Sequence, residues 1–224
     1  MKDYQKMSRE FKDNLFQQFA RIGKSLSSEK RLEILNLLSQ GPKSVEVLAN
    51  YTESGMANVS KHLQALYEAR LVKYKKTGTY VYYELADKAV SNFLSLFWKL
   101  GESQIPDIQR FKEELNHNFE DVRTLTLDEL RQAMETGEIV LLDVRPQDEY
   151  ENDHIPGAIS IPIEDLEGRM LSLPKTDKVI AYCRGPYCIY AAQAVQLLAN
   201  CGFNAYRLEE GVVEWRQSEK TKLQ

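Results

Sequence analysis

A short apolar strand, a six-residue loop and an amphipathic helix follow one another in the second half of the chain. Residues 178–182 are mostly apolar and include β-branched side chains, which is typical of a buried strand. Residues 189–200 place apolar side chains at spacings of three and four, which indicates a helix. This strand–loop–helix unit constrains the chain to a sheet with helices packed on it. The loop consists of Cys183, Arg184, Gly185, Pro186, Tyr187 and Cys188.

Cys183 stands where the predicted strand ends, shortly before the helix begins. A loop in this position can direct several backbone N–H groups at one point, and the helix N-terminus adds the positive end of its dipole. Thiols in such places ionise readily, so Cys183 is the candidate nucleophile. The alternative is a buried cysteine at a strand end that has no chemistry.

Strands and helices alternate through the rest of the second half. Thr126 and Glu129 match a capping box that starts a helix, and Gly137 suits the end of that helix. The alternation predicts a parallel α/β sheet whose ligand site lies at the carboxyl ends of the strands, beside Cys183. The other expected strands cover residues 139–142, 159–161 and 203–208, and a last helical turn covers residues 210–215.

The charge of the chain is unevenly divided. Residues 1–102 hold 16 Lys and Arg against 11 Asp and Glu, a net charge of +5, so the remainder carries −9 of the total of −4. The first half therefore suits nucleic acid, which would repel the second half. The sequence has no apolar run long enough for a membrane span, no apolar leader and only three cysteines, so we expect a cytoplasmic protein with free thiols and no membrane partner.

The first half is predicted to be mainly helical. In the last of its four expected helices, Val59, Leu63 and Leu66 form an inward stripe, and Ser44 can cap the third. The four helices are expected at residues 4–24, 29–39, 44–50 and 55–70.

Two β-rich runs at residues 71–76 and 79–85 flank a Thr-Gly turn, which predicts a hairpin whose tip carries Lys73, Lys75 and Lys76. Helices followed by such a hairpin make a winged helix-turn-helix. Each lysine alone is more often a solvated surface charge, but clustering on a recognition helix and a wing favours phosphate contact. His62 has an equal chance of being a packing or capping residue and of being a DNA contact. The candidate DNA-binding residues are Met56, Asn58, Ser60, Lys61, His62, Lys73, Lys75 and Lys76.

The same region carries a recognisable residue set: Leu48, Ala49, residues 59–63, Leu66, Ala69, Leu71, Val72 and residues 81–83. With this set, residues 28–85 resemble the arsenic-repressor (ArsR/SmtB) family of bacterial transcription regulators. The resemblance implies a homodimer, built from the first helix and the helix after the wing. It also implies repression at a palindromic double-stranded operator until a signal releases the protein.

The metal sites of that family are missing here. Its arsenic sensors carry Cys-x-Cys in the helix that begins at Ser44, where this chain has Ser44 and Glu46. Its zinc sensors place His and Asp ligands on the helix after the wing, and residues 87–102 contain no histidine. We therefore predict no metal and no cofactor. The recognition helix begins with Gly55-Met56, where Ser-Gln is more usual in the family. The operator sequence of other members therefore cannot be assigned to this chain.

The second half carries another motif set: residues 142–145, Glu149, Tyr150, residues 154–158, residues 183–185, Gly211, Glu214 and Trp215. These motifs resemble a rhodanese domain. The resemblance implies that the Cys183 thiolate takes a sulfane sulfur from a donor such as thiosulfate, holds it as a persulfide and yields it to a thiophilic acceptor. The six-residue loop favours sulfur over phosphate, because related phosphatases have a loop one residue longer.

The rhodanese resemblance also assigns roles around Cys183, the expected catalytic residue. Many members close the loop with Arg, but this chain has Cys188 at that place. Cys188 could form a persulfide, polysulfide or disulfide bridge to Cys183. The equal alternative is that Cys188 is a plain cysteine at the start of a helix. Arg184 is expected to attract an anionic donor. The pocket-support residues are Asp143 and Arg145, expected as an internal ion pair, and His154, expected as a loop-fixing hydrogen-bond partner.

Between the halves, residues 87–100 are apolar on nearly every side, which suits a helix buried between two subunits. Ile105-Pro106 breaks this helix, and a polar helix follows. We predict two domains, a mainly α winged helix-turn-helix followed by an α/β rhodanese-like parallel sheet. Their limits are residues 1–104 for DNA binding and dimerisation, 105–122 for a linker helix and 123–224 for the rhodanese-like domain.

The leading hypothesis is a homodimeric DNA-binding repressor whose rhodanese domain senses or transfers sulfane sulfur through a persulfide of Cys183. A second hypothesis is an enzyme, a thiosulfate-type sulfurtransferase tethered to a DNA-binding domain that answers another signal. A third is a rhodanese fold used only for docking. The expected partners are double-stranded DNA, a second copy of the chain, and a small sulfur donor or acceptor.

Overall fold

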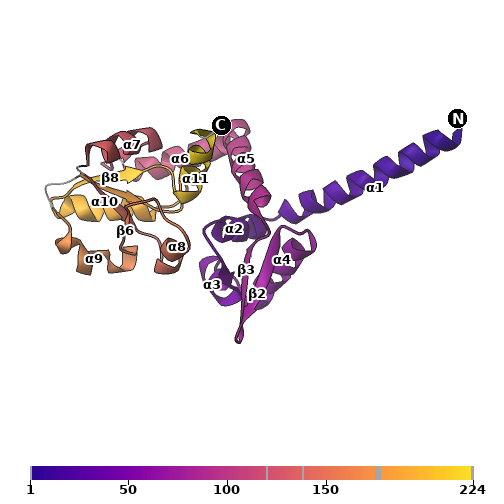
Figure 1. Cartoon of the computed structure of the whole chain (residues 1–224), viewed down its shortest axis with the longest axis horizontal. Coiled ribbons are helices and arrows are strands. Elements are labelled where there is room, and N and C mark those ends of the chain that lie inside the picture. Colours follow the sequence, from indigo (N-terminus) through magenta and orange to yellow (C-terminus); the bar gives the residue numbers. More distant parts are fainter. Residues whose placement is uncertain (1, 120, 138, 175–177, 223–224) are drawn as a thin grey trace. The chain divides into compact units, whose positions relative to one another are not determined.

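The computed structural model describes residues 2–119, 121–137, 139–174 and 178–222 (Figure 1). The chain divides into two compact units, residues 1–97 and residues 98–224. This division falls inside helix α5 (Lys88–Gln104), whereas the sequence placed a limit at residue 104; the three-part domain scheme stays a prediction. In the described part of the chain, no helix is long and apolar enough to cross a membrane.

The first unit is helical apart from one small antiparallel sheet of strand order β1-β3-β2. The four predicted helices and the hairpin are all present, and their bounds differ from the expected ones by a few residues. The short strand β1, which pairs with β3, was not predicted. The elements are α1 (Lys2–Leu26), α2 (Glu29–Leu38), β1 (Lys43–Ser44), α3 (Val45–Tyr51), α4 (Met56–Glu68), β2 (Val72–Thr77), β3 (Tyr80–Leu85) and the first part of α5.

The core of the first unit follows the predicted apolar spacing. Val59, Leu63 and Leu66 of α4 are fully buried, as their i, i+4, i+7 pattern requires. The Ser44 hydroxyl accepts the Val47 N–H and so caps α3. Gly78 adopts a φ of 61° in the hairpin turn, a conformation that costs glycine nothing. Local capping and turn chemistry thus define this helix-turn-helix and its wing.

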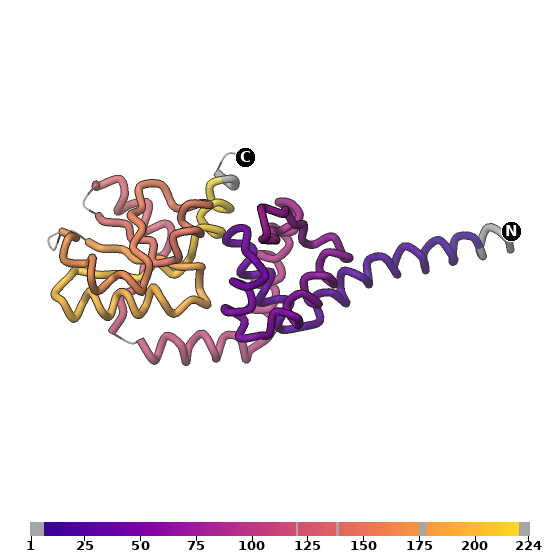
Figure 2. The backbone as a smooth tube through the Cα atoms, turned by 90° about the horizontal axis from the view of Figure 1, so that it is seen from below, coloured from indigo at the N-terminus to yellow at the C-terminus, as the bar shows by residue number. Residues whose placement is uncertain are grey.

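Helix α1 extends two residues beyond each end of the predicted range 4–24. It extends away from the rest of the first unit in both views (Figures 1 and 2). One consequence is that many of its large apolar side chains have no cover within the chain. The exposed ones are Met7, Phe11, Leu15, Phe16, Phe19 and Ile22.

The second unit contains a five-stranded parallel sheet of order β4-β8-β7-β5-β6, which confirms the predicted parallel α/β class. Helix α11 runs far beyond the single turn expected at residues 210–215. The strands are β4 (Thr124–Leu125), β5 (Ile139–Asp143), β6 (Ile159–Ser160), β7 (Lys178–Tyr182) and β8 (Asn204–Leu208). The helices are the end of α5, α6 (Pro106–His117), α7 (Leu127–Thr136), α8 (Gln147–Asn152), α9 (Leu166–Arg169), α10 (Tyr190–Asn200) and α11 (Val212–Lys222), with 3-10 turns η1 (Ile163–Asp165) and η2 (Met170–Ser172).

Side chains of the central strands alternate between two apolar layers. Val179 and Ala181 of β7 pack with α9 and α10, whereas Ile180 and Tyr182 pack with α7 and α11. Burial of both faces explains why this strand is apolar throughout rather than alternating with polar residues. The carboxyl end of β7 therefore lies in the middle of a rigid sheet, which fixes the start of the cysteine loop.

Both ends of α7 form as predicted. Thr126 and Glu129 exchange the two hydrogen bonds of a capping box, and Gly137 ends the helix with a φ of 74°. Pro106 likewise opens α6 immediately after the break that Ile105-Pro106 predicted. These boundaries depend on local chemistry, which is why sequence located them.

Candidate functional site

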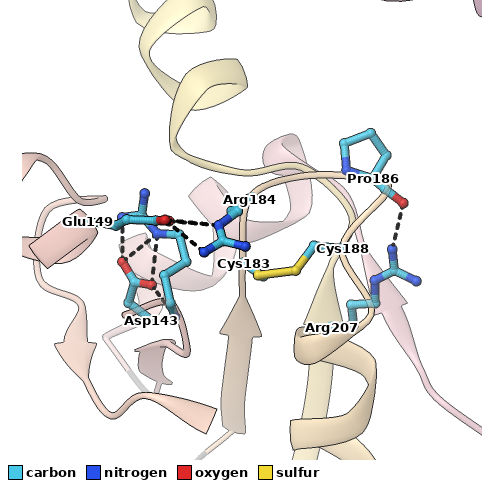
Figure 3. The surroundings of a disulfide bond; sticks show 8 residues. Asp143, Glu149, Cys183, Arg184, Pro186, Cys188 and Arg207 are labelled. Carbon is cyan, nitrogen blue, oxygen red and sulfur yellow. Dashed lines mark hydrogen bonds and ion pairs between the residues drawn. A yellow bond between two sulfur atoms is a disulfide. The ribbon is translucent and has the colours of Figure 1, made fainter. Parts of the chain in front are cut away.

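The cysteine loop lies at the carboxyl end of β7, the middle strand of the parallel sheet (Figure 3). Cys183 follows β7 directly and is 2% exposed, whereas Cys188, two residues before α10, is partly exposed. A disulfide joins the two. The sequence had left a bridge to Cys188 open, and in this structure that bridge is the state of the loop.

Arg184 is paired with Glu149 of α8 (Figure 3). Its Nε donates to both carboxylate oxygens at 3.0 and 2.9 Å, and its Nη2 donates to Oε1 at 2.8 Å. The Glu149 side chain is fully buried, so the pair is a desolvated, bidentate contact of the strong kind. The expectation that Arg184 attracts an anionic donor stays a prediction, and in this structure a buried carboxylate matches the charge of Arg184.

Asp143 and Arg145 form the internal ion pair that the sequence predicted, with Nη2 and Oδ2 separated by 2.6 Å. Both side chains are buried, and Arg145 also donates to the Asp153 carbonyl at 2.7 Å. His154 lies on the same connection, where its Nδ1 is 2.9 Å from the Tyr150 carbonyl oxygen and its ring stacks on the Tyr150 ring. These contacts fix the segment between β5 and β6, beside the cysteine loop.

The backbone of the cysteine loop packs directly against Gly211. A Cβ at Gly211 would lie 2.8 Å from the Cys183 carbonyl oxygen and 2.8 Å from the Gly185 nitrogen. Gly185 itself has a φ of 118°, and a Cβ there would meet the Glu214 carboxylate at 3.2 Å. Glu214 accepts the Gly211 N–H at 2.9 Å, and burial raises the pKa of its carboxyl group. Two glycines therefore allow the approach of the loop to the segment before α11.

Arg207 supports the loop from the neighbouring strand β8. It is 4% exposed, and its Nη2 donates to the Pro186 carbonyl at 3.2 Å (Figure 3). Its Nη1 donates to the Asn116 side chain of α6 at 3.3 Å, and burial lowers the pKa of its guanidinium. Arg207 thus joins the cysteine loop to α6 within the second unit.

Tyr187 provides a second connection from the loop to a helix. Its hydroxyl donates to Oε1 of Glu102 at 2.7 Å, and the same oxygen accepts from Lys112 of α6 at 3.2 Å. Burial and this hydrogen bond together raise the pKa of Tyr187. Glu102 belongs to the last part of α5, a helix that begins in the first unit, so a loop side chain is bonded to an element that continues into the winged helix-turn-helix.

The candidate DNA-binding residues lie in a different unit from the cysteine loop. On α4, Met56, Asn58, Ser60 and Lys61 are exposed and His62 is partly buried. The wing lysines are all exposed, but Lys73 lies near the base of the hairpin and not at its tip. This is a correction to the expected position, because Lys73 faces Glu84 across the strands at 3.7 Å. The tip proper carries Lys75 and Lys76.

No group of three or more His, Cys, Asp or Glu side chains among the described residues could hold a metal ion. The predicted absence of a metal stays a prediction, as does the absence of a cofactor.

Sequence reasoning missed several residues that hold the loop. Arg207 gave one signal, because it is the only charged residue of strand β8. Glu149 had been noticed only as part of a motif and not as the partner of Arg184. Glu102 and Asn116 gave no signal, because nothing in a helical polar residue shows which loop it will meet in the fold.

Two family models match the chain. The rhodanese-like domain matches residues 126–218, and the bacterial regulatory protein, arsR family, matches residues 28–74. The HTH-type transcriptional regulator Rv0324 of Mycobacterium tuberculosis is 39% identical over 202 residues, which cover 90% of this chain and 88% of that protein. This chain belongs to the ArsR family of bacterial transcriptional regulators. It is an ArsR-family regulator with a C-terminal rhodanese-like domain.

Two further likenesses each cover one part of this ArsR-family regulator. A tRNA sulfurtransferase of Desulfurococcus amylolyticus is 34% identical over 88 residues, 38% of this chain and 17% of that protein. The homodimeric winged helix-turn-helix DNA-binding domain of Mb0332 from Mycobacterium bovis is 36% identical, with a TM-score of 0.41, over 42% of this chain and 87% of that one.

Proposed function

We propose that this ArsR-family regulator is a homodimeric DNA-binding repressor that responds to sulfane sulfur through Cys183. The observation that carries the proposal is the position of Cys183, in a six-residue loop at the carboxyl end of the central strand. A thiolate at this point takes a sulfane sulfur as a persulfide, and the N–H groups of the loop and of the α10 N-terminus stabilise the outer sulfur.

DNA binding is assigned to α4 and the wing. The first half of the chain is positively charged, α4 presents exposed polar side chains, and the hairpin tip carries Lys75 and Lys76. Lysines on a wing contact phosphates, whereas the recognition helix reads base edges in the major groove. The affinity therefore falls steeply with salt. The logarithm of the binding constant falls against the logarithm of the salt concentration with a slope of about −0.9 per neutralised phosphate.

The homodimer is assigned to the exposed apolar faces of α1 and α5. Phe11, Phe16 and Phe19 of α1 are each more than half exposed, and so are Leu96 and Leu100 of α5. Large apolar side chains gathered on two helices favour burial against another surface, and a second copy supplies the same faces by symmetry.

The donor is a small persulfide in preference to thiosulfate. Thiosulfate is a dianion, and Arg184 is committed to Glu149 at 2.8 Å. The loop also lies close to the Glu214 carboxyl group. With the charge of Arg184 matched by Glu149, a singly charged or neutral donor is favoured over a dianion.

The state of the cysteine loop reaches the winged helix-turn-helix through α5. Tyr187 is bonded to Glu102 at 2.7 Å, and Pro186 is bonded through Arg207 to Asn116 of α6. A change at Cys183 that moves Tyr187 breaks or re-forms the hydrogen bond between the Tyr187 hydroxyl and the Glu102 carboxylate. Coupling of this kind requires that the two loop states differ in their contacts with α5, which is the element that both units share.

The test uses the full-length protein and a duplex enriched from a random pool on the reduced protein. Affinity is measured by fluorescence anisotropy before and after treatment with cysteine persulfide, and intact mass is recorded on the same sample. A change in mass that needs Cys183, either one added sulfur or two lost hydrogens, together with lost affinity supports the proposal. Cys183→Ser must abolish both changes, and Cys201→Ser must abolish neither. The absence of any salt-dependent duplex binding would overturn the DNA-binding assignment.

A second candidate is a sulfurtransferase tethered to a regulator that answers another signal. The likeness of the second half to a tRNA sulfurtransferase favours it. This reading requires steady turnover with thiosulfate and cyanide, together with an affinity for DNA that sulfur does not change. A protein that takes up no sulfur under either donor would leave the rhodanese fold with a docking role.

A further inference from the structure

We propose that the cysteine loop also reduces the sulfane sulfur that it accepts, with Cys188 as the resolving thiol. The products are hydrosulfide and a loop closed by the Cys183–Cys188 disulfide. The inference rests on the proposed function for the first step, the loading of Cys183. It adds a second activity, the conversion of sulfane sulfur to hydrosulfide, at the same loop.

The structure places the two thiols within bonding reach without rearrangement of the fold. Their Cα atoms are 6.2 Å apart, inside the range that a disulfide spans, and the two sulfur atoms are bonded (Figure 3). The chain turns back between them because Gly185 has a φ of 118° and its carbonyl accepts the Cys188 N–H at 3.1 Å. This turn brings Cys188 over the end of β7.

The two cysteines differ in exposure in the way that a nucleophile and a resolving thiol require. Cys183 is 2% exposed, so a persulfide on it is sheltered, whereas Cys188 is partly exposed at the mouth of the loop. Cys188 also immediately precedes Ile189, the N-cap of the eleven-residue helix α10. The positive end of that helix favours the thiolate of Cys188, which is the attacking form.

The bridge identifies the sulfur that Cys188 reaches, which is Sγ of Cys183 and not an atom beyond it. In a persulfide of Cys183 this is the inner sulfur. Attack there forms the Cys183–Cys188 bond, breaks the bond to the outer sulfur and expels that sulfur as hydrosulfide. The outer sulfur gains two electrons, and the two cysteine sulfurs together lose two.

The steps balance as follows. A low-molecular-weight persulfide, RSSH, gives its outer sulfur to the Cys183 thiolate, and RS⁻ leaves. The Cys188 thiolate then attacks the Cys183 persulfide, and HS⁻ leaves. In sum, RSSH and two cysteine thiols give RSH, H₂S and the disulfide. Two equivalents of a cellular thiol reduce the disulfide and return the loop to its starting state.

The two arginines described beside the loop are each held by other groups, so the expulsion of hydrosulfide does not have to compete with an arginine that holds the outer sulfur in place. Arg184 is held by the buried Glu149, and Arg207 is bonded to the Pro186 carbonyl and to Asn116. Cys188 occupies the place of the closing Arg that the rhodanese resemblance implies. The residue that would stabilise an outer sulfur anion is thus replaced by one that displaces it.

The experiment uses the full-length, reduced and desalted protein under anaerobic conditions with cysteine persulfide as the probe. Hydrosulfide is measured against a sample of the probe alone, and intact mass is measured before any reductant is added. The wild-type protein is expected to release one hydrosulfide per chain and to become lighter by two hydrogens. Cys188→Ser is expected to release none and to become heavier by one sulfur on Cys183.

Cys201→Ser is the matched control and must behave as the wild-type protein, because Cys201 is a free cysteine outside the loop. A wild-type chain that keeps its extra sulfur and releases no hydrosulfide overturns the inference while the proposed function stands. A Cys188→Ser chain that gains no sulfur contradicts the proposed function and the inference together. Cys188→Ala repeats the measurement, and the wild-type stoichiometry decides the inference if neither variant folds.

Discussion

At the scale of single residues, the cysteine loop depends on groups that supply no chemistry of their own. Gly211 leaves room for the loop backbone, Glu149 holds Arg184, and Arg207 holds the Pro186 carbonyl. Each holds a different part of the loop, so each can be tested by one substitution with a matched control.

Gly211→Ala is expected to destabilise the protein by about 1–3 kcal/mol, the usual cost of overpacking. The added methyl group would lie 2.8 Å from the Cys183 carbonyl oxygen, and backbone cannot move aside as a side chain can. Sulfur loading of Cys183 should slow as well. Urea unfolding and intact-mass kinetics check the two effects, and Gly168→Ala, which meets nothing within 4 Å, should show neither.

Glu214→Gln is expected to flatten the pH dependence of stability. Burial raises the pKa of Glu214 above its ordinary value of 4.5, so the folded state binds this proton more tightly than the unfolded state. The associated stability is complete below the ordinary pKa and is lost as pH rises through the folded pKa. Urea unfolding at a series of pH values should show that the free energy of unfolding falls less for the variant than for the wild-type protein as pH rises through that window. Parallel plots of this free energy against pH would contradict the assignment.

At the scale of elements, α5 has two kinds of neighbour. Its first part belongs to the winged helix-turn-helix unit, and its last part holds Glu102 against the cysteine loop. The loop-to-helix bond is a single side-chain contact that Lys112 supports from α6. The same helix therefore contacts the loop through its last part and belongs to the winged helix-turn-helix unit through its first part.

Glu102→Ala should leave sulfur loading of Cys183 intact and reduce the change in DNA affinity that loading causes. The substitution removes the acceptor of the Tyr187 hydroxyl without touching the loop itself. Anisotropy titrations of loaded and reduced protein give the ratio of the two affinities. Glu113→Ala, which removes an exposed glutamate from neighbouring α6, should keep the wild-type ratio. An unchanged ratio in Glu102→Ala would remove this bond from the coupling route.

At the scale of the whole molecule, the exposed apolar side chains of α1 cannot be explained within one chain. Phe19→Glu should weaken the homodimer and lower DNA affinity, because a charge replaces a side chain that is 60% exposed in the single chain and buried in the proposed dimer. Light scattering after gel filtration, at several concentrations, measures the change. Gln17→Glu adds the same charge to the same helix and should leave the dimer intact, provided that the interface lies on the apolar face.

Sequence alone determined the order and type of nearly all elements, because their signals are local. The apolar stripe of α4, the capping box at Thr126, the Ile105-Pro106 break and the apolar run of β7 each act within a few residues. The position of Cys183 at a strand end followed from the same patterns. So did the ion pair of Asp143 and Arg145, two residues apart on one connection.

Only the tertiary structure decided which distant residues meet at the loop. Arg184 and Glu149 are 35 positions apart, and Tyr187 and Glu102 are 85 apart, so no local pattern relates them. Their pairing depends on the parallel sheet, which brings the ends of β5, β7 and β8 to one edge. Long-range contacts of this kind set the electrostatics of the loop, and for that reason the sequence could not show that Glu149 is the partner of Arg184.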